Sequence, residues 1–169
     1  DSLTSDKKNE YLYDMWRNKA VQNTYEPGST FKIITAAIGL EENIVESNIA
    51  NTFYCAGHEV VDNTTINCWR HYRPHEGQTL EQALANSCNP AFIQLGLKIG
   101  APTLYKYYDA FGLLSNTNSQ FYGESNSVFY NENSIRKSEL ATMAFGQGVT
   151  ITPLQLVTAV SAIANEGVF

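Results

Sequence analysis

Apolar side chains recur at helical spacing in six stretches of the chain, and polar or irregular sequence separates these stretches. The spacing predicts helices over residues 29–41, 79–86, 90–99, 102–111, 138–145 and 152–164. Two of them open on a capping-box pattern, Thr79-x-x-Gln82 and Thr152-x-x-Gln155. In a capping box the threonine side chain accepts from the backbone N–H of the glutamine, and the glutamine side chain accepts from the backbone N–H of the threonine. Pro90 suits the first position of another helix, because that position needs no N–H donor.

The sequence between these helices has other patterns. Residues 1–10 are polar and predict a flexible loop, and residues 114–133 are rich in Ser, Asn and Tyr and predict a long irregular one. Residues 44–73 alternate short apolar and polar groups, with Val60-Val61 and residues 64–66 indicating a small hairpin. Gly146-Gln147-Gly148 is interpreted as a turn between two helices, since the rest of a phosphate-binding loop is missing. No internal repeat or linker interrupts this helix-rich domain.

Composition narrows the class of protein. With 169 residues, 43% hydrophobic and 17% charged, the chain is typical of one globular domain with a sizeable core. Its net charge of −6, without a basic cluster, argues against a nucleic-acid partner. Apolar runs such as residues 33–40 are too short to cross a bilayer, and the sequence from Asp1 does not open with the charged start of a signal peptide. By itself the sequence would be interpreted as a soluble domain.

Ser29 and Lys32 are three residues apart where a turn leads into an apolar helix. On a helix this spacing places both side chains on one face, where a lysine can take the proton of a serine hydroxyl. The same spacing occurs at residues 5–8 and 134–137, but only Ser29 follows a Pro-Gly pair and opens an apolar run. The alternative is a plain helix cap with an exposed lysine one turn later.

Ser87-Cys88-Asn89 is the only Ser-x-Asn triplet in the chain, and it lies between two predicted helices. A loop in that position can present a hydroxyl and an amide rigidly into a cleft. Asn89 before Pro90 also suits a helix N-cap, but that interpretation leaves Ser87 unexplained.

Together these motifs resemble the transpeptidase domain of penicillin-binding proteins, especially the monofunctional class B type. The resemblance rests on residues 16–21, 25–32, 87–90, 139–148 and 152–156, in matching order and spacing. It implies an α/β, serine β-lactamase/transpeptidase-like fold, of which this chain is mostly the helical lobe. The third family element, Lys-Thr-Gly or Lys-Ser-Gly, is absent. We therefore expect residues 1–169 to form a partial domain that needs the remainder of its own polypeptide.

The resemblance implies peptidoglycan cross-linking through an acyl-serine. Ser29 would attack the bond between two terminal D-alanines of a stem peptide, with Lys32 as general base. Ser87 would relay a proton to the leaving amine, Asn89 would hold the substrate, and the Ser29 N–H would form half of an oxyanion hole. β-Lactam antibiotics would acylate the same serine. A D,D-carboxypeptidase or β-lactamase of the same fold, or a non-catalytic β-lactam receptor, is the alternative, although no equivalent of the β-lactamase glutamate is found.

The family also implies a location and a partner. The domain would lie on the extracytoplasmic face of the cell membrane, held by an anchor not present here, and a glycosyltransferase would work with it. Elongation, division and sporulation enzymes share these motifs.

Cysteines and histidines cluster between positions 55 and 75. Cys55, His58, Cys68 and His71 form two C-x-x-H pairs, and His75 follows one helical turn after His71. Thiolate and imidazole together suit tetrahedral zinc, so we predict a closed structural zinc site within a hairpin at residues 53–75. The acyl-transfer chemistry itself requires no cofactor.

The ligand set stays open at this point. His71 and His75 could be the histidine pair without His58, and Asp62 is a further candidate ligand. A Cys55–Cys68 disulfide is the main alternative to metal. Cys88 is interpreted as a buried small residue within the Ser-x-Asn triplet.

Overall fold

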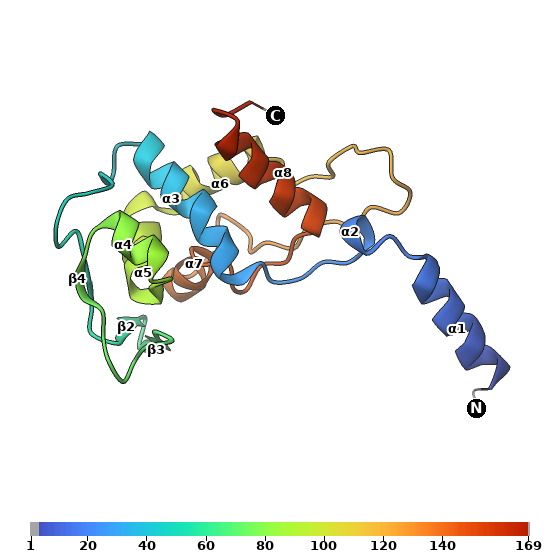
Figure 1. Ribbon diagram of the computed structural model, residues 1–169, viewed down its shortest axis with the longest axis horizontal. Coiled ribbons are helices and arrows are strands. Elements are labelled where there is room, and N and C mark those ends of the chain that lie inside the picture. Colours follow the sequence, from blue (N-terminus) through green and yellow to red (C-terminus); the bar gives the residue numbers. More distant parts are fainter. Residues whose placement is uncertain (1–3, 169) are drawn as a thin grey trace.

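The computed structural model describes residues 4–168 and consists mainly of helices, with two small sheets at one end (Figure 1). The first half of the chain contains α1 (Ser5–Trp16), α2 (Lys19–Gln22), a 3₁₀ turn η1 (Gly28–Phe31), α3 (Lys32–Glu41), β1 (Phe53–Cys55), β2 (His58–Val61), β3 (Thr64–Asn67) and β4 (Glu76–Gln78). The second half contains α4 (Leu80–Ala85), α5 (Asn89–Ile99), α6 (Ala101–Ala110), α7 (Lys137–Met143) and α8 (Pro153–Ala164).

Helices α3 and α5 form the centre of the core. Ile34 and Ile38 of α3 and Phe92 and Leu95 of α5 are fully buried. Burying one such side chain stabilises a fold by about 1.5–3 kcal/mol relative to leaving it exposed. Helix α5 also packs closely on α7, because a Cβ at Gly96 would lie 2.3 Å from the Cβ of Ala144. The core therefore fixes the two helices at whose N-terminal ends the candidate motifs lie.

The two sheets are short and antiparallel. Strands β2 and β3 form a hairpin that pairs His58 with Asn67 and Val61 with Thr64, as the sequence predicted for this region. Asp62 and Asn63 both have positive φ, which a two-residue hairpin turn of type I′ requires. Strands β1 and β4 enclose this hairpin in the sequence and pair Cys55 with Glu76. The outer pairing brings the ends of a 20-residue stretch together beside α5.

The predicted helices all occur, with small shifts at their ends. The two predicted capping boxes are formed at Thr79–Gln82 and Thr152–Gln155. The helix predicted from residue 29 begins as η1 and becomes α-helical at Lys32. The loop at residues 114–133, which the structure describes throughout, contains neither helix nor strand, as predicted. In the described residues, no helix has the length and apolar character needed to cross a membrane.

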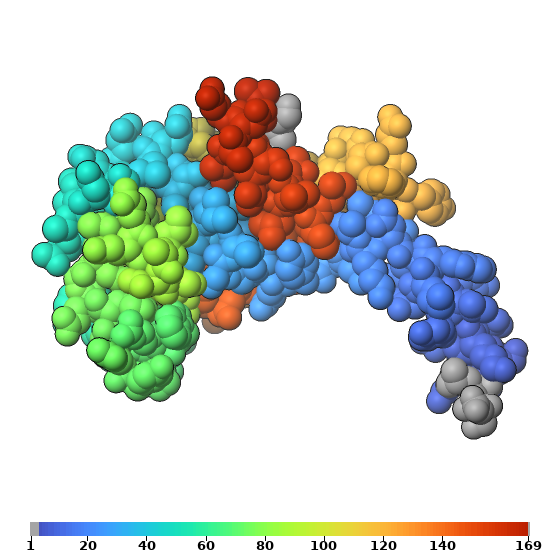
Figure 2. Space-filling model, in the orientation of Figure 1, coloured from blue at the N-terminus to red at the C-terminus, as the bar shows by residue number. Residues whose placement is uncertain are grey.

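The prediction of a flexible loop at residues 1–10 is wrong for the part the structure describes. Residues 5–10 belong to α1, while residues 1–3 lie outside the described residues. This helix buries none of its side chains and extends from the body as an arm (Figures 1 and 2). The first half of α1, which falls in the predicted loop, is polar, and a polar helix exposed on all sides has no apolar period that distinguishes it from a loop.

Candidate active site

The turn that carries Ser29 is held by the Gly-Gln-Gly turn more than a hundred residues later. The Gly28 N–H donates to the Gly146 carbonyl at 2.9 Å, and the Gly148 N–H donates to the Glu26 carboxylate at 2.9 Å. Gly146 has φ +83°, and a Cβ there would lie 2.2 Å from the Gly28 carbonyl oxygen. Only glycine permits this approach of two backbones. The turn predicted at residues 146–148 therefore also positions Ser29.

Lys32 joins the two motifs. Its side chain is fully buried, and its Nζ lies 3.2 Å from Ser29 Oγ and 3.0 Å from Ser87 Oγ. The same Nζ donates to the Ser87 carbonyl and to Asn89 Oδ1, both at 2.8 Å. The structure thus brings together all four predicted residues, Ser29, Lys32, Ser87 and Asn89, around one nitrogen. The helix-cap alternative required an exposed lysine, which the burial of Lys32 contradicts.

The surroundings of Lys32 favour its neutral form. Burial lowers the pKa of Lys32 to about 8, although the nearby Cys88 and Cys68 thiols act in the opposite direction. The Nζ also lies over the rings of Phe92 and Phe145, at 5.6 and 5.9 Å from their centroids, and these ring faces attract a cation, so they too oppose the effect of burial. Among the described residues it forms no ion pair with a carboxylate. A lysine in such a site can accept a proton near neutral pH.

Ser87 lies in a sharp turn between α4 and α5. Its φ is +50°, a left-handed conformation that is uncommon for serine and concentrates at functional sites. The Ser87 N–H donates to the Leu84 carbonyl at 3.0 Å, and the Cys88 N–H donates to the Ala83 carbonyl at 2.9 Å, so the end of α4 fixes this turn. Asn89 Nδ2 donates to the Asn67 carbonyl at 3.2 Å. The amide of Asn89 therefore connects Lys32 to the end of the β2–β3 hairpin.

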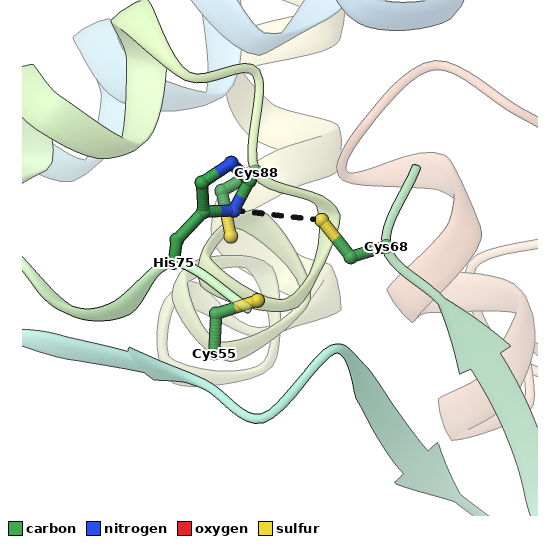
Figure 3. A group of neighbouring side chains, drawn as sticks. All are labelled: Cys55, Cys68, His75 and Cys88. Carbon is green, nitrogen blue, oxygen red and sulfur yellow. Dashed lines mark hydrogen bonds between the residues drawn. The ribbon is translucent and has the colours of Figure 1, made fainter. Parts of the chain in front are cut away.

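A second cluster lies directly behind this turn. Cys55, Cys68, His75 and Cys88 place one ligand atom each within 4.8 Å of one another (Figure 3). The three cysteines are buried and free, and His75 Nδ1 lies 3.6 Å from Cys68 Sγ. The four side chains come from the end of β1, the residue after β3, the residue before β4 and the N-cap of α5. The cluster therefore joins both small sheets to the core helix.

This donor set fits a tetrahedral zinc ion. Zinc–sulfur bonds of about 2.3 Å imply ligand atoms about 3.8 Å apart. The ligand atoms of the cluster all lie within 4.8 Å of one another, and Cys68 Sγ and His75 Nδ1 are 3.6 Å apart. Cys₃His is a common structural zinc set, and the free thiols do not form the Cys55–Cys68 disulfide that was the alternative. A thiol is a weak hydrogen-bond donor and a weak acceptor, so three buried thiols and an imidazole form only weak hydrogen bonds with one another. A metal ion bound by all four would replace these weak contacts.

The cluster differs from the predicted ligand set. His58 and His71 lie outside it, both exposed, and His75 and Cys88 take their places. His58 begins strand β2 and His71 stacks edge-on against Tyr72, whereas the pairing of Cys55 with Glu76 brings the neighbouring His75 to the cysteines. Asp62 instead accepts a hydrogen bond from the Ser138 N–H at 3.2 Å. Cys88 is buried as predicted, but the sequence analysis did not assign it as a ligand. The available signal was that it is the one cysteine of the three left outside the predicted ligand set.

Comparison with known proteins agrees with this geometry. A family model described as the penicillin binding protein transpeptidase domain matches residues 2–169. The chain belongs to the penicillin-binding protein transpeptidase family. Stage V sporulation protein D of Bacillus subtilis (strain 168) is 44% identical to this transpeptidase-family chain over 151 residues, which are 89% of the chain and 23% of that protein. The peptidoglycan D,D-transpeptidase FtsI of Escherichia coli (strain K12) is 30% identical over 156 residues, 90% of the chain and 25% of that protein. The chain thus spans about a quarter of the length of these curated relatives.

Solved structures confirm the predicted fold class. The transpeptidase domain of penicillin-binding protein 3 from Burkholderia pseudomallei has a TM-score of 0.82 and 25% identity, covering 89% of this chain and 44% of that one. A peptidoglycan glycosyltransferase from Burkholderia ambifaria has a TM-score of 0.83 and 26% identity, covering 92% and 48%. The chain therefore has the α/β transpeptidase fold, and its described part is mostly helical.

Proposed function

We propose that this chain is part of a serine D,D-transpeptidase that cross-links peptidoglycan stem peptides through an acyl-serine. The observation that carries the proposal is the buried Lys32 Nζ, which lies within hydrogen-bond distance of Ser29, Ser87 and Asn89 together. Activation of a serine by an adjacent base, held by a third group, is the arrangement that nucleophilic catalysis requires. The names of the relatives, which include peptidoglycan D,D-transpeptidases, support the same substrate.

The hydrogen bonds of Lys32 suggest how protons move. A neutral amine has two N–H donors and one lone pair. The Ser87 carbonyl and Asn89 Oδ1 can only accept, so they engage both donors and leave the lone pair toward a serine hydroxyl. Ser29 then loses its proton to Lys32 as its Oγ attacks the D-alanyl carbonyl. Ser87 Oγ, 3.0 Å from the same nitrogen, donates its proton to the departing D-alanine amine and takes from Lys32 the proton that Ser29 lost, which leaves Lys32 neutral again.

The acyl-serine is resolved by the amine of a second stem peptide, which forms the cross-link and regenerates the Ser29 hydroxyl. The Ser29 N–H supplies one oxyanion donor. The Lys-Thr-Gly element that the resemblance requires is not in the sequence, so we propose that the remainder of the polypeptide completes the cleft. β-Lactams would acylate Ser29 in place of the peptide. We further propose that the domain functions on the extracytoplasmic face of the cell membrane, beside a glycosyltransferase partner.

A fluorescent penicillin tests this proposal on the full-length protein. Wild type should become labelled stably, and Ser29→Ala should abolish the label. Ser134→Ala is the matched control, because Ser134 and Lys137 repeat the Ser-x-x-Lys spacing on an exposed segment. Rapid loss of label would favour the β-lactamase alternative. Labelling without cross-linking of peptide substrates would favour the receptor alternative, and no labelling of wild type would contradict all of them.

We also propose that Cys55, Cys68, His75 and Cys88 hold a structural zinc ion. When bound, zinc supplies cross-linking of the peripheral sheets to α5 and takes no part in acyl transfer. The closeness of the four ligand atoms and their burial support this assignment. Mass spectrometry of protein purified without chelator should find about one zinc per chain. Cys68→Ser should lose it, whereas His58→Gln should retain it; protein without metal would contradict the assignment.

A further inference from the structure

The segment between Cys68 and His75 has an unusual composition for this acidic chain. Residues 69–73, here called the rim loop, read Trp-Arg-His-Tyr-Arg and contain two of the 11 Lys and Arg residues and no carboxylate. The net charge of the whole chain is −6, so the rim loop carries positive charge against the general balance. Its Trp69 and Tyr72 side chains are 57% and 75% exposed. Exposed aromatic rings beside arginines are a composition typical of recognition surfaces.

The rim loop is fixed to the catalytic turn. Trp69 Nε1 donates to the carbonyl of Asn86, the residue before Ser87, at 2.9 Å. On its other side, Asn67 precedes Cys68 and its carbonyl accepts from Asn89 Nδ2. The backbone just before the rim loop is therefore bound to Asn89, at the C-terminal end of the Ser87-Cys88-Asn89 triplet. The Trp69 side chain is bound next to the N-terminal end of the same triplet. Residues 53–78, in teal and green, lie together at one end of the molecule (Figure 2).

Further contacts limit the movement of the rim loop. The Cys68 N–H donates to the Gly57 carbonyl at 2.9 Å, and the Arg73 N–H donates to the Arg70 carbonyl at 3.2 Å. A Cβ at Gly57 would lie 2.7 Å from the His71 carbonyl oxygen, so the Gly57 turn packs directly against the backbone of the rim loop. The Trp69 ring also packs on His75, with centroids 5.8 Å apart. Because the Trp69 ring is already held in one position, it loses little conformational entropy when a ligand covers it.

We propose that the rim loop is a specificity-determining subsite that binds an anionic segment of the stem peptide next to the reacting D-alanines. The Trp69 ring covers the apolar part of the stem peptide, and Arg70 and Arg73 pair with a carboxylate that is not the peptide's C-terminus. This inference rests on the proposed transpeptidase function. Two features carry it: the loop adjoins the Ser87 turn, and its charge is complementary to an acidic peptide.

The test compares two soluble substrates in the full-length protein. Both are disaccharide-linked stem peptides ending in two D-alanines; one has free non-terminal carboxylates and the other has them amidated. We expect Trp69→Ala to raise KM for either substrate about five- to tenfold, which is the usual worth of one aromatic contact, with kcat within about twofold. We expect wild type to prefer the carboxylate form several-fold, and the double variant Arg70→Gln, Arg73→Gln to lose that preference.

Two controls separate binding from structural damage. Trp16→Ala removes another exposed tryptophan, 74% exposed on the arm α1, and should leave KM unchanged. Trp69→Phe keeps a ring without the N–H donor and should recover part of the wild-type KM. The rate of fluorescent-penicillin labelling reports whether Ser29 and Ser87 remain in place, and we expect it to stay within about twofold in all variants.

Several outcomes would overturn the proposal. If Trp69→Ala lowers penicillin labelling and substrate turnover in parallel, Trp69 only supports the turn. If KM is unchanged in both variants, another part of the polypeptide covers the rim loop or the substrate passes elsewhere. If wild type used the carboxylate and the amidated substrate equally well, the proposed role of the arginines would be contradicted. Failure of wild type to be labelled at all would instead contradict the proposed function.

Discussion

At the scale of single residues, the state of Lys32 decides whether Ser29 can react. Two of the oxygens around Nζ can only accept hydrogen bonds, which suits both the charged and the neutral lysine. Burial favours the neutral lysine and lowers its pKa to about 8. At pH 7 a minority of molecules therefore holds Lys32 ready to act as a base.

Acylation should consequently depend on pH in a defined direction. Because the neutral lysine is the base, the rate constant of penicillin acylation should rise about tenfold per pH unit below pH 7 and level off above the Lys32 pKa of about 8. Stopped-flow labelling of the full-length protein between pH 5.5 and about 9.5 measures the profile. A flat profile over this range would show that Lys32 is not the titrating base.

Asn89 allows a sharper version of the same test. Its Oδ1 accepts from Lys32 Nζ at 2.8 Å, so Asn89→Asp places a carboxylate of nearly the same shape against the lysine. An opposite charge at that distance raises a lysine pKa by about 1–3 units. We expect acylation at pH 7 to fall about tenfold or more and to recover as the pH rises.

Asn89→Ala is the control for Asn89→Asp, since it removes the hydrogen bond without adding charge. It should lower the acylation rate without moving the midpoint of the profile upward. If Asn89→Asp leaves the midpoint unchanged, the contact between Asn89 and Lys32 does not set the basicity of Lys32.

At the scale of elements, the Gly-Gln-Gly turn supports the turn that carries Ser29. Gly146 combines a positive φ with contact against backbone, since a Cβ would lie 2.2 and 2.8 Å from the Gly28 carbonyl oxygen and nitrogen. Backbone cannot swing aside as a flexible side chain can. We expect Gly146→Ala to lower the free energy of unfolding by about 2–4 kcal/mol and to slow penicillin labelling. Chemical denaturation measures the first effect.

Gly167→Ala provides the comparison for Gly146→Ala. Its φ of +84° matches the +83° of Gly146, but nothing lies within 4 Å of its Cβ position. It should therefore cost only the left-handed conformation, about 1 kcal/mol, and leave labelling unchanged. Equal effects of the two substitutions would show that the approach of Gly146 to Gly28 does not hold the active-site turn.

The elements also show which parts of the site were predictable from sequence. Ser29 and Lys32 share one turn of chain, and Ser87 and Asn89 share another, so local patterns located them. The metal ligands were harder, because His75 reaches Cys55 only through the β1–β4 pairing, and that register is not encoded in the Cys-x-x-His spacing. Helix α1 was missed because it buries no apolar side chain that would reveal its period.

At the scale of the whole molecule, the body and the peripheral sheets differ in what holds them. The body has a core of buried helices around α3 and α5, whereas each peripheral sheet has two strands of three or four residues and adds few apolar side chains, such as Phe53 and Val61, to that core. Two-stranded sheets of this size are marginal in water without further support. The Cys55, Cys68, His75 and Cys88 cluster joins both sheets to the N-cap residue of α5, and through it to the catalytic turn.

If this cluster holds zinc as proposed, removal of the metal should destabilise the molecule and loosen the catalytic turn. At free zinc a thousand times its Kd, binding stabilises the fold by about 4 kcal/mol. Chelation should lower the thermal unfolding midpoint by about 8–16 °C for a domain of this size. Differential scanning fluorimetry of the full-length protein, with and without chelator, measures the shift. Cys55→Ser should reproduce the low midpoint and be insensitive to chelator.

The histidines that the sequence favoured provide the matched controls for chelation. His58→Gln and His71→Gln alter exposed side chains outside the cluster, so both should keep the wild-type midpoint and its full sensitivity to chelator. His75→Gln should lose both, because its Nδ1 faces Cys68. If His71→Gln behaved like Cys55→Ser while His75→Gln did not, the ion would be held by the Cys-x-x-His pairs, and the β1–β4 register would have to differ.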